Sequence, residues 1–299
     1  MVDDYSSVEV PSLLVNGVRF PDVFPRECVE SAIKHRAHDE DLIVCTYPKS
    51  GTTWVQYILC YLLHYDEFDG TVAKMNALCP FVDHFGTDKL KPGMMYKQHL
   101  PFNPETFNDK SRLIIVVRNP RDVAISFYHF VTLLPPKVPG VPEGANWFKR
   151  FSQLFVRGEV WYGDYMEWHR GWLEGARKYG KPENILFVVY EKMKKDPRKE
   201  LIRIANFLGE EVVELIKDEK VIETILEKTH VRSMKEAVNE SYSATLDDES
   251  GEIPEVVEFV RKGTVGDHVN YFTPEISKMF DEYIASDPRN REIMDMFDV

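Results

Sequence analysis

The 299-residue sequence predicts a single α/β domain, in which a central parallel β-sheet is flanked by helices. Three short apolar runs, at 42–45, 113–117 and 185–189, have the length and composition of buried strands. A turn and then a segment with helical periodicity follow each run, as in a parallel sheet with helical crossovers. No internal repeat and no sharp change of composition divides the chain, so we expect residues 1–299 to form one domain.

Residues 94–97 form a fourth and weaker strand candidate, and the remaining segments carry helix and loop signals. Asn119 can cap a helix that has Pro120 in its first turn, which predicts a helix from about Pro120 to Thr132. The proline-rich stretch 134–142 predicts a loop. Residues 146–178 carry many aromatic side chains at roughly helical intervals, and most of these should pack in the core. Residues 236–255 are polar and acidic and predict a mobile surface segment.

Composition and charge exclude several classes of protein. With 37 basic and 49 acidic residues the net charge is −12, which excludes a protein that binds nucleic acid through a basic surface. The N-terminus lacks the features of a secretory signal and no run is long enough to span a membrane, so we expect a cytoplasmic protein without a membrane partner. The four cysteines have no metal-ligand spacing and predict neither a disulfide framework nor a zinc site.

The stretch TYPKSGTTW, residues 46–54, lies directly between a predicted buried strand and a predicted helix. A strand that ends in such a turn exposes the first N–H groups of the following helix, and these groups attract anions. Ser50, Thr52 and Thr53 add hydroxyl donors, and Gly51 allows the backbone to approach a phosphate closely. Lys49 adds a positive charge, so this turn predicts a phosphate-binding site.

The order of residues in this turn differs from that of a P-loop kinase. A P-loop has its lysine after the final glycine, whereas Lys49 precedes Gly51 here and the upstream glycine is missing. A small-molecule kinase therefore remains only an alternative. A protein that binds a nucleotide or a lipophile without turnover is the second alternative, although His99 together with Lys49 argues against it.

The sequence TYPKSGTTW resembles the phosphosulfate-binding loop of the cytosolic sulfotransferases. Further matches follow in the family's order: KQHLP at 97–101 resembles the catalytic histidine segment, VRNPRDVAISFY at 117–128 the segment that binds a 3′-phosphate, and VYE at 189–191 and FVRKG at 259–263 complete the set. The resemblance spans about residues 40–285. It implies a fold related to the P-loop nucleotide kinases, 3′-phosphoadenosine 5′-phosphosulfate (PAPS) as sulfonate donor, 3′-phosphoadenosine 5′-phosphate (PAP) as product, and a small hydroxyl or amine acceptor.

The resemblance assigns catalytic roles to three residues. We expect His99 to be the general base, Lys49 to stabilise the leaving phosphate, and Lys97 to stabilise the sulfuryl oxygens. Because lysines would neutralise the developing charge, we expect no metal to be required.

The two substrates would occupy two sets of residues. Donor binding is expected at Lys49, Ser50, Gly51, Thr52, Thr53, Trp54, Arg118, Ser126, Tyr190, Met234, Arg261, Lys262 and Gly263. The acceptor pocket is expected at Phe20, Phe24, Phe81, His99, Phe127, Tyr128 and Phe148, a composition that suits phenolic or aromatic-amine compounds.

Two departures from the family pattern affect adenine binding and association. Met234 stands where the family has an adenine-stacking Phe, and a methionine is a softer and less specific cover. The family's dimerisation motif is degraded, with Val269 and Pro274 in place of Lys and Val. We therefore expect a monomer or a differently arranged dimer.

Overall fold

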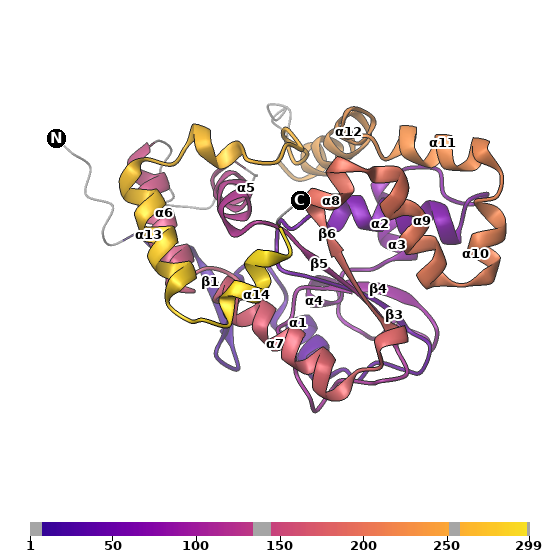
Figure 1. Ribbon diagram of the computed structural model, residues 1–299, viewed down its shortest axis with the longest axis horizontal. Coiled ribbons are helices and arrows are strands. Elements are labelled where there is room, and N and C mark those ends of the chain that lie inside the picture. Colours follow the sequence, from indigo (N-terminus) through magenta and orange to yellow (C-terminus); the bar gives the residue numbers. More distant parts are fainter. Residues whose placement is uncertain (1–7, 134–144, 251–257, 298–299) are drawn as a thin grey trace.

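The computed structural model describes residues 8–133, 145–250 and 258–297, and its centre is a four-stranded parallel sheet (Figure 1). The strands lie in the order β4-β3-β5-β6, with bounds β3 (Leu42–Thr46), β4 (Met95–Gln98), β5 (Arg112–Val117) and β6 (Ile185–Val189). All four predicted strands are confirmed. The weakest candidate, β4, is an edge strand, and it is only partly buried along its length. A separate antiparallel hairpin, β1 (Ser12–Val15) and β2 (Val18–Pro21), precedes the sheet.

Helices cover both faces of the sheet, as expected. One face carries α1 (Arg26–Lys34), α5 (Pro120–Leu133), α6 (Ala145–Val156), α7 (Tyr165–Tyr179), α13 (Pro274–Ala285) and α14 (Asn290–Asp295). The other face carries α2 (Thr52–Leu63), α3 (Val72–Leu78), α9 (Pro197–Leu208), α10 (Glu210–Leu215), α11 (Glu219–Lys228) and α12 (Val231–Ser250). Two short helices, α4 (Val82–Phe85) and α8 (Tyr190–Lys195), lie near the ends of strands, and 3₁₀ turns occupy 182–184 and 267–270.

The central strands are apolar throughout because both of their faces are buried. In β3, Ile43 and Cys45 pack into the core on one side of the sheet, whereas Leu42 and Val44 pack into the core on the other side. The same alternation occurs in β5. A strand buried on both faces shows a continuous apolar run rather than an alternating one, and this run is what made the strands visible in the sequence.

The aromatic residues of 146–178 pack in the core, as predicted. They belong to α6 and α7 and to the turn between these helices. Trp147, Phe151, Phe155, Tyr165 and Trp168 are each at most 2% exposed. Their rings fill the space between the sheet and α13 on this face of the molecule.

Residues 236–250, which belong to the segment predicted to be mobile, are part of α12, and this helix extends without interruption to Ser250. Met234 and Val238, one helical turn apart, are both buried and attach the helix to the core. The Asn239 side chain pairs with the backbone of Val260, accepting from its N–H at 2.9 Å. Two buried apolar residues therefore anchor this part of a helix that is mostly polar in sequence. Residues 251–255 and the proline-rich stretch 134–142 lie outside the described residues.

All four cysteines are unpaired, in agreement with the prediction. Among the described helices, none has both the length and the apolar character that crossing a bilayer requires.

The two-sided burial of β5 leads to a stability prediction. Ile115 is fully buried in this strand, and Ile115→Ala should lower the free energy of unfolding by about 2–5 kcal/mol because a cavity remains in a close-packed core. The matched control is Ile202→Ala on α9, where the side chain is 36% exposed and the expected change is about 0.5 kcal/mol or less. Urea denaturation measures both values, and equal losses in the two variants would contradict the described core.

Candidate active site

A cavity of about 560 Å³ lies where the carboxyl ends of the four parallel strands meet. Each strand contributes to its wall through the residues that follow it: Lys49 after β3, His99 after β4, Arg118 after β5 and Tyr190 after β6. Ligand sites of open parallel sheets are found at this edge, and the volume is typical of a site for a small organic molecule.

The turn between β3 and α2 has the predicted strand-turn-helix form. Two of its residues adopt left-handed backbone conformations, Lys49 with φ +67° and Gly51 with φ +104°. A Cβ at Gly51 would lie 2.7 Å from the Tyr190 ring, so only glycine fits between the turn and this ring. Thr52 and Thr53 of the first turn of α2 line the cavity, whereas the Ser50 side chain is fully buried and does not line it.

Lys49 is a partly desolvated cation. Its Nζ lies between two aromatic rings, 4.2 Å from the centre of Phe130 and 4.3 Å from that of Phe259. Burial, together with repulsion from Arg118, Lys97 and Arg261, lowers the pKa of Lys49 to about 7. An anion in the cavity would restore the full charge of this lysine.

Arg118 links the turn after β3 to the opposite wall. Its guanidinium donates to the carbonyl oxygen of Lys49 at 3.0 Å and lies 4.2 Å from the centre of the Tyr190 ring. The Nε of Arg118 is buried and has no hydrogen-bond partner among the described residues. The indole Nε1 of Trp54, another wall residue, is buried and unpartnered in the same way. Two orphaned donors in one cavity are costly unless a polar ligand accepts from them.

The segment that follows α12 brings two more cations to this wall. Arg261 and Lys262 line the cavity, and both bind Asp267, at 2.6 Å and 2.9 Å. The segment is fastened to α5 by Asp122, whose carboxylate accepts from the backbone N–H groups of Gly266 and His268. At the start of α5, Asn119 acts as the predicted cap, since its side chain accepts from the N–H of Arg121 at 3.0 Å.

His99 is held in one orientation by its neighbours. Its backbone N–H donates to Asp83 Oδ2 at 2.9 Å, and its carbonyl oxygen accepts from the Trp168 indole at 2.8 Å. The ring Nδ1 lies 2.7 Å from the carbonyl oxygen of Thr46, which can only accept, so Nδ1 carries the proton. Nε2 is therefore the ring nitrogen with an available lone pair.

His99 is neutral in the free protein, because burial and the charges of Lys97 and Lys49 lower its pKa to about 3. Asp83, which sequence reasoning missed, is fully buried beside it, and burial raises the pKa of this carboxyl to about 7. No local pattern marks Asp83, since it stands in a short segment without strand or clear helix periodicity.

The acceptor side of the cavity is aromatic. Phe24 lies edge-on to Phe81, with ring centres 5.5 Å apart, and stacks on His84 at 4.7 Å. The Lys97 Nζ lies 4.4 Å from the centre of the Phe81 ring, and burial lowers the pKa of this lysine. His84 is a further residue that sequence reasoning missed.

Four predicted pocket residues do not line the cavity and belong to the core instead. Phe20 packs against Tyr162, Phe127 is fully buried, and Tyr128 and Phe148 pack against each other at 5.0 Å. For residues 127 and 128 the reason is helix geometry: Ser126 faces the cavity, and the next two residues point away because each step along a helix turns about 100°. Phe130, one turn after Ser126, faces the cavity, so the four-residue spacing was the signal that could have found it.

Apart from Ser50, the structure brings the remaining predicted residues together around one cavity. Those that line the cavity are Lys49, Gly51, Thr52, Thr53, Trp54, Lys97, His99, Arg118, Ser126, Tyr190, Met234, Arg261, Lys262 and Gly263, with Phe24 and Phe81 of the predicted pocket.

Comparison with known proteins identifies the family of this chain. Residues 39–296 match the family model described as the sulfotransferase domain. The amine sulfotransferase of Oryctolagus cuniculus is 30% identical over 270 residues, which cover 87% of this chain and 85% of that protein. Sulfotransferase 1C2 of Rattus norvegicus is 32% identical over 264 residues, covering 83% of this chain and 82% of that protein.

The solved structures extend the comparison to the fold. Mouse sulfotransferase SULT7A1, complexed with PAP, superposes with a TM-score of 0.67 at 25% identity and covers 95% of this chain and 99% of its own. A retinol dehydratase has a TM-score of 0.70 at 22% identity, with coverage of 94% and 88%. Sequence, site and fold agree, and the chain belongs to the cytosolic sulfotransferase family.

Proposed function

We propose that this sulfotransferase moves a sulfonate group from PAPS to the hydroxyl group of a small aromatic acceptor. The observation that carries the proposal is that Lys49, Lys97 and His99 line one cavity. The same cavity is lined by further cationic side chains and by aromatic rings. The PAP complex of the mouse relative supports the choice of donor.

The donor has anionic groups at two separate positions and needs two cationic sites. The turn at 49–54 and the first N–H groups of α2 would hold the 5′-phosphosulfate. Arg118, Ser126 and the segment 261–263 would hold the 3′-phosphate, to which the unpartnered Nε of Arg118 could donate.

The adenine would lie among the aromatic residues of the donor wall. The Trp54 and Tyr190 rings meet edge to face, with centres 5.5 Å apart, and the buried Nε1 of Trp54 lacks an acceptor. Met234 would cover the opposite side of the base. The bare backbone at Gly51 and the two orphaned donors fit a ligand of this size and polarity.

The proposed transfer is an in-line displacement at sulfur. The acceptor oxygen forms a bond to sulfur while the bond from sulfur to the bridging phosphate oxygen breaks, and the electron pair goes to that oxygen. Lys49 stabilises the negative charge that grows on the leaving group. Lys97 stabilises the sulfuryl oxygens, and the acceptor proton goes to Nε2 of His99, which is already neutral and oriented. The reaction requires that negative charge on the leaving group and the sulfuryl oxygens is stabilised and that the acceptor is positioned. These side chains can do both, so we propose that transfer needs no metal.

The charge of the cavity favours a phenol over a protonated amine as acceptor. Lys97 and Lys49 lie beside His99 and lower its pKa through their charge, and they would repel a cationic acceptor in the same way. The Phe24, Phe81 and His84 rings suit a flat molecule. The rabbit relative is named for amines, so a neutral aromatic amine is the second candidate acceptor.

We also propose that the protein works in the cytoplasm as a monomer or as a dimer that differs from the family's usual one. In support of the second point, Pro274 is the first residue of α13, which Thr273 caps through its side chain. A proline there offers no backbone N–H to a partner.

The test of the proposed function is transfer from radiolabelled PAPS to a panel of phenols, aromatic amines, steroids and aliphatic alcohols. We expect label to be transferred to phenols both with and without a chelator. For amines that are cationic at neutral pH, we expect the transfer rate to rise with pH as the amines lose their charge. Label that moves only from ATP and only with magnesium would support a kinase instead. Binding of PAP without transfer to any acceptor would support the non-catalytic alternative.

His99→Ala tests the general base. Turnover should fall about 10²–10⁴-fold, because the proton acceptor is lost, while the affinity for PAP should stay within about threefold of the original. Steady-state kinetics and calorimetry with PAP measure these two quantities. The matched control is His64→Ala, at a surface histidine next to Glu67, which should retain full turnover. Unchanged turnover in His99→Ala would remove this residue from the base role.

The lowered pKa of Lys49 predicts a pH dependence of donor binding. Below about pH 7 the free lysine is already protonated, whereas above it a bound anion has to draw a proton onto Nζ, so the affinity for PAP should fall as the pH rises. Between pH 7.5 and 9 the phosphates of PAP are fully ionised and do not contribute. Calorimetry in two buffers of different ionisation enthalpy should show proton uptake in this range.

Lys49→Arg is the matched control for this pH dependence, since a guanidinium stays charged throughout. The variant should bind PAP with a clearly smaller slope between pH 7.5 and 9, because the contribution of Lys49 is removed, even if its turnover is lower. An equal slope in the variant and the original protein would show that another group titrates.

A further inference from the structure

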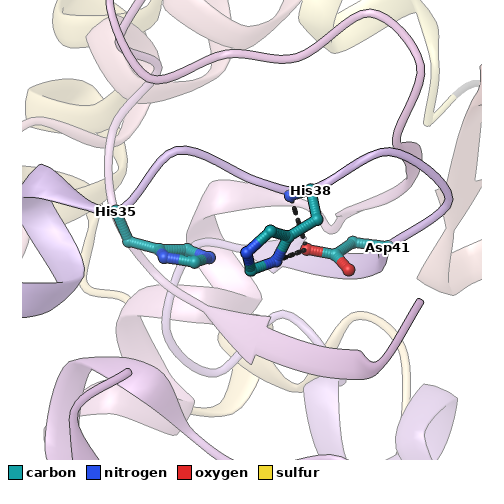
Figure 2. Close-up of side chains that lie close together, drawn as sticks. All are labelled: His35, His38 and Asp41. Atoms are coloured by element: carbon teal, nitrogen blue, oxygen red, sulfur yellow. Dashed lines mark hydrogen bonds and ion pairs between the residues drawn. The ribbon is translucent and has the colours of Figure 1, made fainter. Parts of the chain in front are cut away.

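A cluster of three side chains that could bind a metal lies at the start of β3, the end of the strand opposite the active-site turn (Figure 2). His35 follows the last residue of α1, His38 lies in the connecting loop, and Asp41 directly precedes β3. In Figure 2 the His38 ring lies between the His35 ring and the Asp41 carboxylate. The proposed transfer reaction uses none of these residues.

The potential ligand atoms are already close together. One nitrogen of each imidazole and one oxygen of the carboxylate lie within 4.8 Å of one another. His38 Nδ1 is 3.3 Å from Asp41 Oδ2. Two ligands with bonds of about 2.0–2.1 Å to a tetrahedral zinc ion are separated by about 3.4 Å, so this pair already has the spacing of one edge of such a site. The His38 side chain is 40% exposed, so its ring has room to adjust until His35, the third ligand, also reaches the metal.

Two of these atoms are buried without a hydrogen-bond partner in the described part of the chain, His35 Nε2 and His38 Nδ1. His38 Nδ1 at least lies 3.3 Å from Asp41 Oδ2, whereas the buried Nε2 of His35 has lost its hydration without a hydrogen bond to replace it. Such a nitrogen can offer its lone pair to a metal ion.

The Asp41 carboxylate is held in place by hydrogen bonds, as metal-binding carboxylates commonly are. It is 1% exposed, its Oδ1 accepts from the N–H of Gly93 at 2.8 Å, and its Oδ2 accepts from the N–H of His38 at 2.8 Å. Each carboxylate oxygen keeps a further lone pair. Hydrogen bonds of this kind hold a ligand in place and are a regular feature of metal sites.

We propose that His35, His38 and Asp41 bind one divalent transition metal of the zinc type, with water in the fourth position. Two imidazoles and one carboxylate form a ligand set that suits zinc and cobalt and disfavours magnesium or calcium, which prefer oxygen ligands alone.

The metal would join parts of the fold that are separate in sequence. The Asp41 carbonyl oxygen accepts from the N–H of Arg112 at 2.7 Å, at the start of β5, and Gly93 lies just before β4. His35 would attach the end of α1 to this junction. Because the site forms only in the folded chain, binding should stabilise the protein without changing the transfer reaction.

The experiment is a titration of the full, chelator-treated protein with Co²⁺, followed by visible absorption, and with Zn²⁺ as competitor. We expect one equivalent with a Kd below about 100 µM and an absorption band typical of four-coordinate Co²⁺. Weaker binding of the original protein would overturn the proposal. Zn²⁺ should raise the thermal unfolding midpoint of the original protein, and an unchanged midpoint would equally overturn it.

Substitutions then locate the site. His35→Gln and His38→Gln should each weaken binding at least about tenfold, abolish the thermal shift and leave turnover unchanged. The control His64→Gln should bind as the original protein does, since within the described part of the chain His64 pairs with Glu67 at 4.0 Å and belongs to no potential metal-binding cluster. Because His38 is well exposed, its variant should fold even if the His35 variant does not. Unaltered binding in His38→Gln would place the metal elsewhere and refute the assignment.

Discussion

The concentration of buried positive charge at one edge of the sheet is the constraint on which the rest of the active site depends. Lys49, Lys97, Arg118 and Arg261 converge there in a protein whose net charge is −12. Mutual repulsion and lost hydration destabilise these cations, as the lowered pKa of Lys49 shows. The packing around these cations holds them together, and an anionic ligand would reduce the repulsion between them.

The packing that maintains this arrangement comes from segments far apart in the sequence. His99 is held by the carboxylate of Asp83 on one side and by the indole of Trp168 on the other. The turn after β3 fits against Tyr190 because position 51 has no side chain. The aromatic core of α6 and α7 thus serves two purposes, since it stabilises the domain and also fixes the general base proposed above.

How much the sequence could predict depended on whether a feature is local. The strands were predictable because burial on both faces leaves a continuous apolar run, and the anion-binding turn because all its parts lie within 46–54. The pocket was only half predictable, since Phe127 and Phe130 are alike in type and differ only in the direction they face on α5. Asp83 and the helical form of 236–250 depend on contacts with distant residues, which no local pattern records.

Asp267 has a consequence for selectivity. In the free protein its carboxylate already binds Arg261 and Lys262, and these bonds help to hold its pKa at about 2, so it stays ionised at any physiological pH. At the donor site proposed above, an incoming anion would therefore compete with a singly charged internal carboxylate for these two cations. A doubly charged phosphate would bind the two cations more strongly than the Asp267 carboxylate does. Chloride or a simple carboxylate, with a single charge, would have no such advantage. If the 3′-phosphate binds here as proposed, the segment would favour doubly charged anions over singly charged ones.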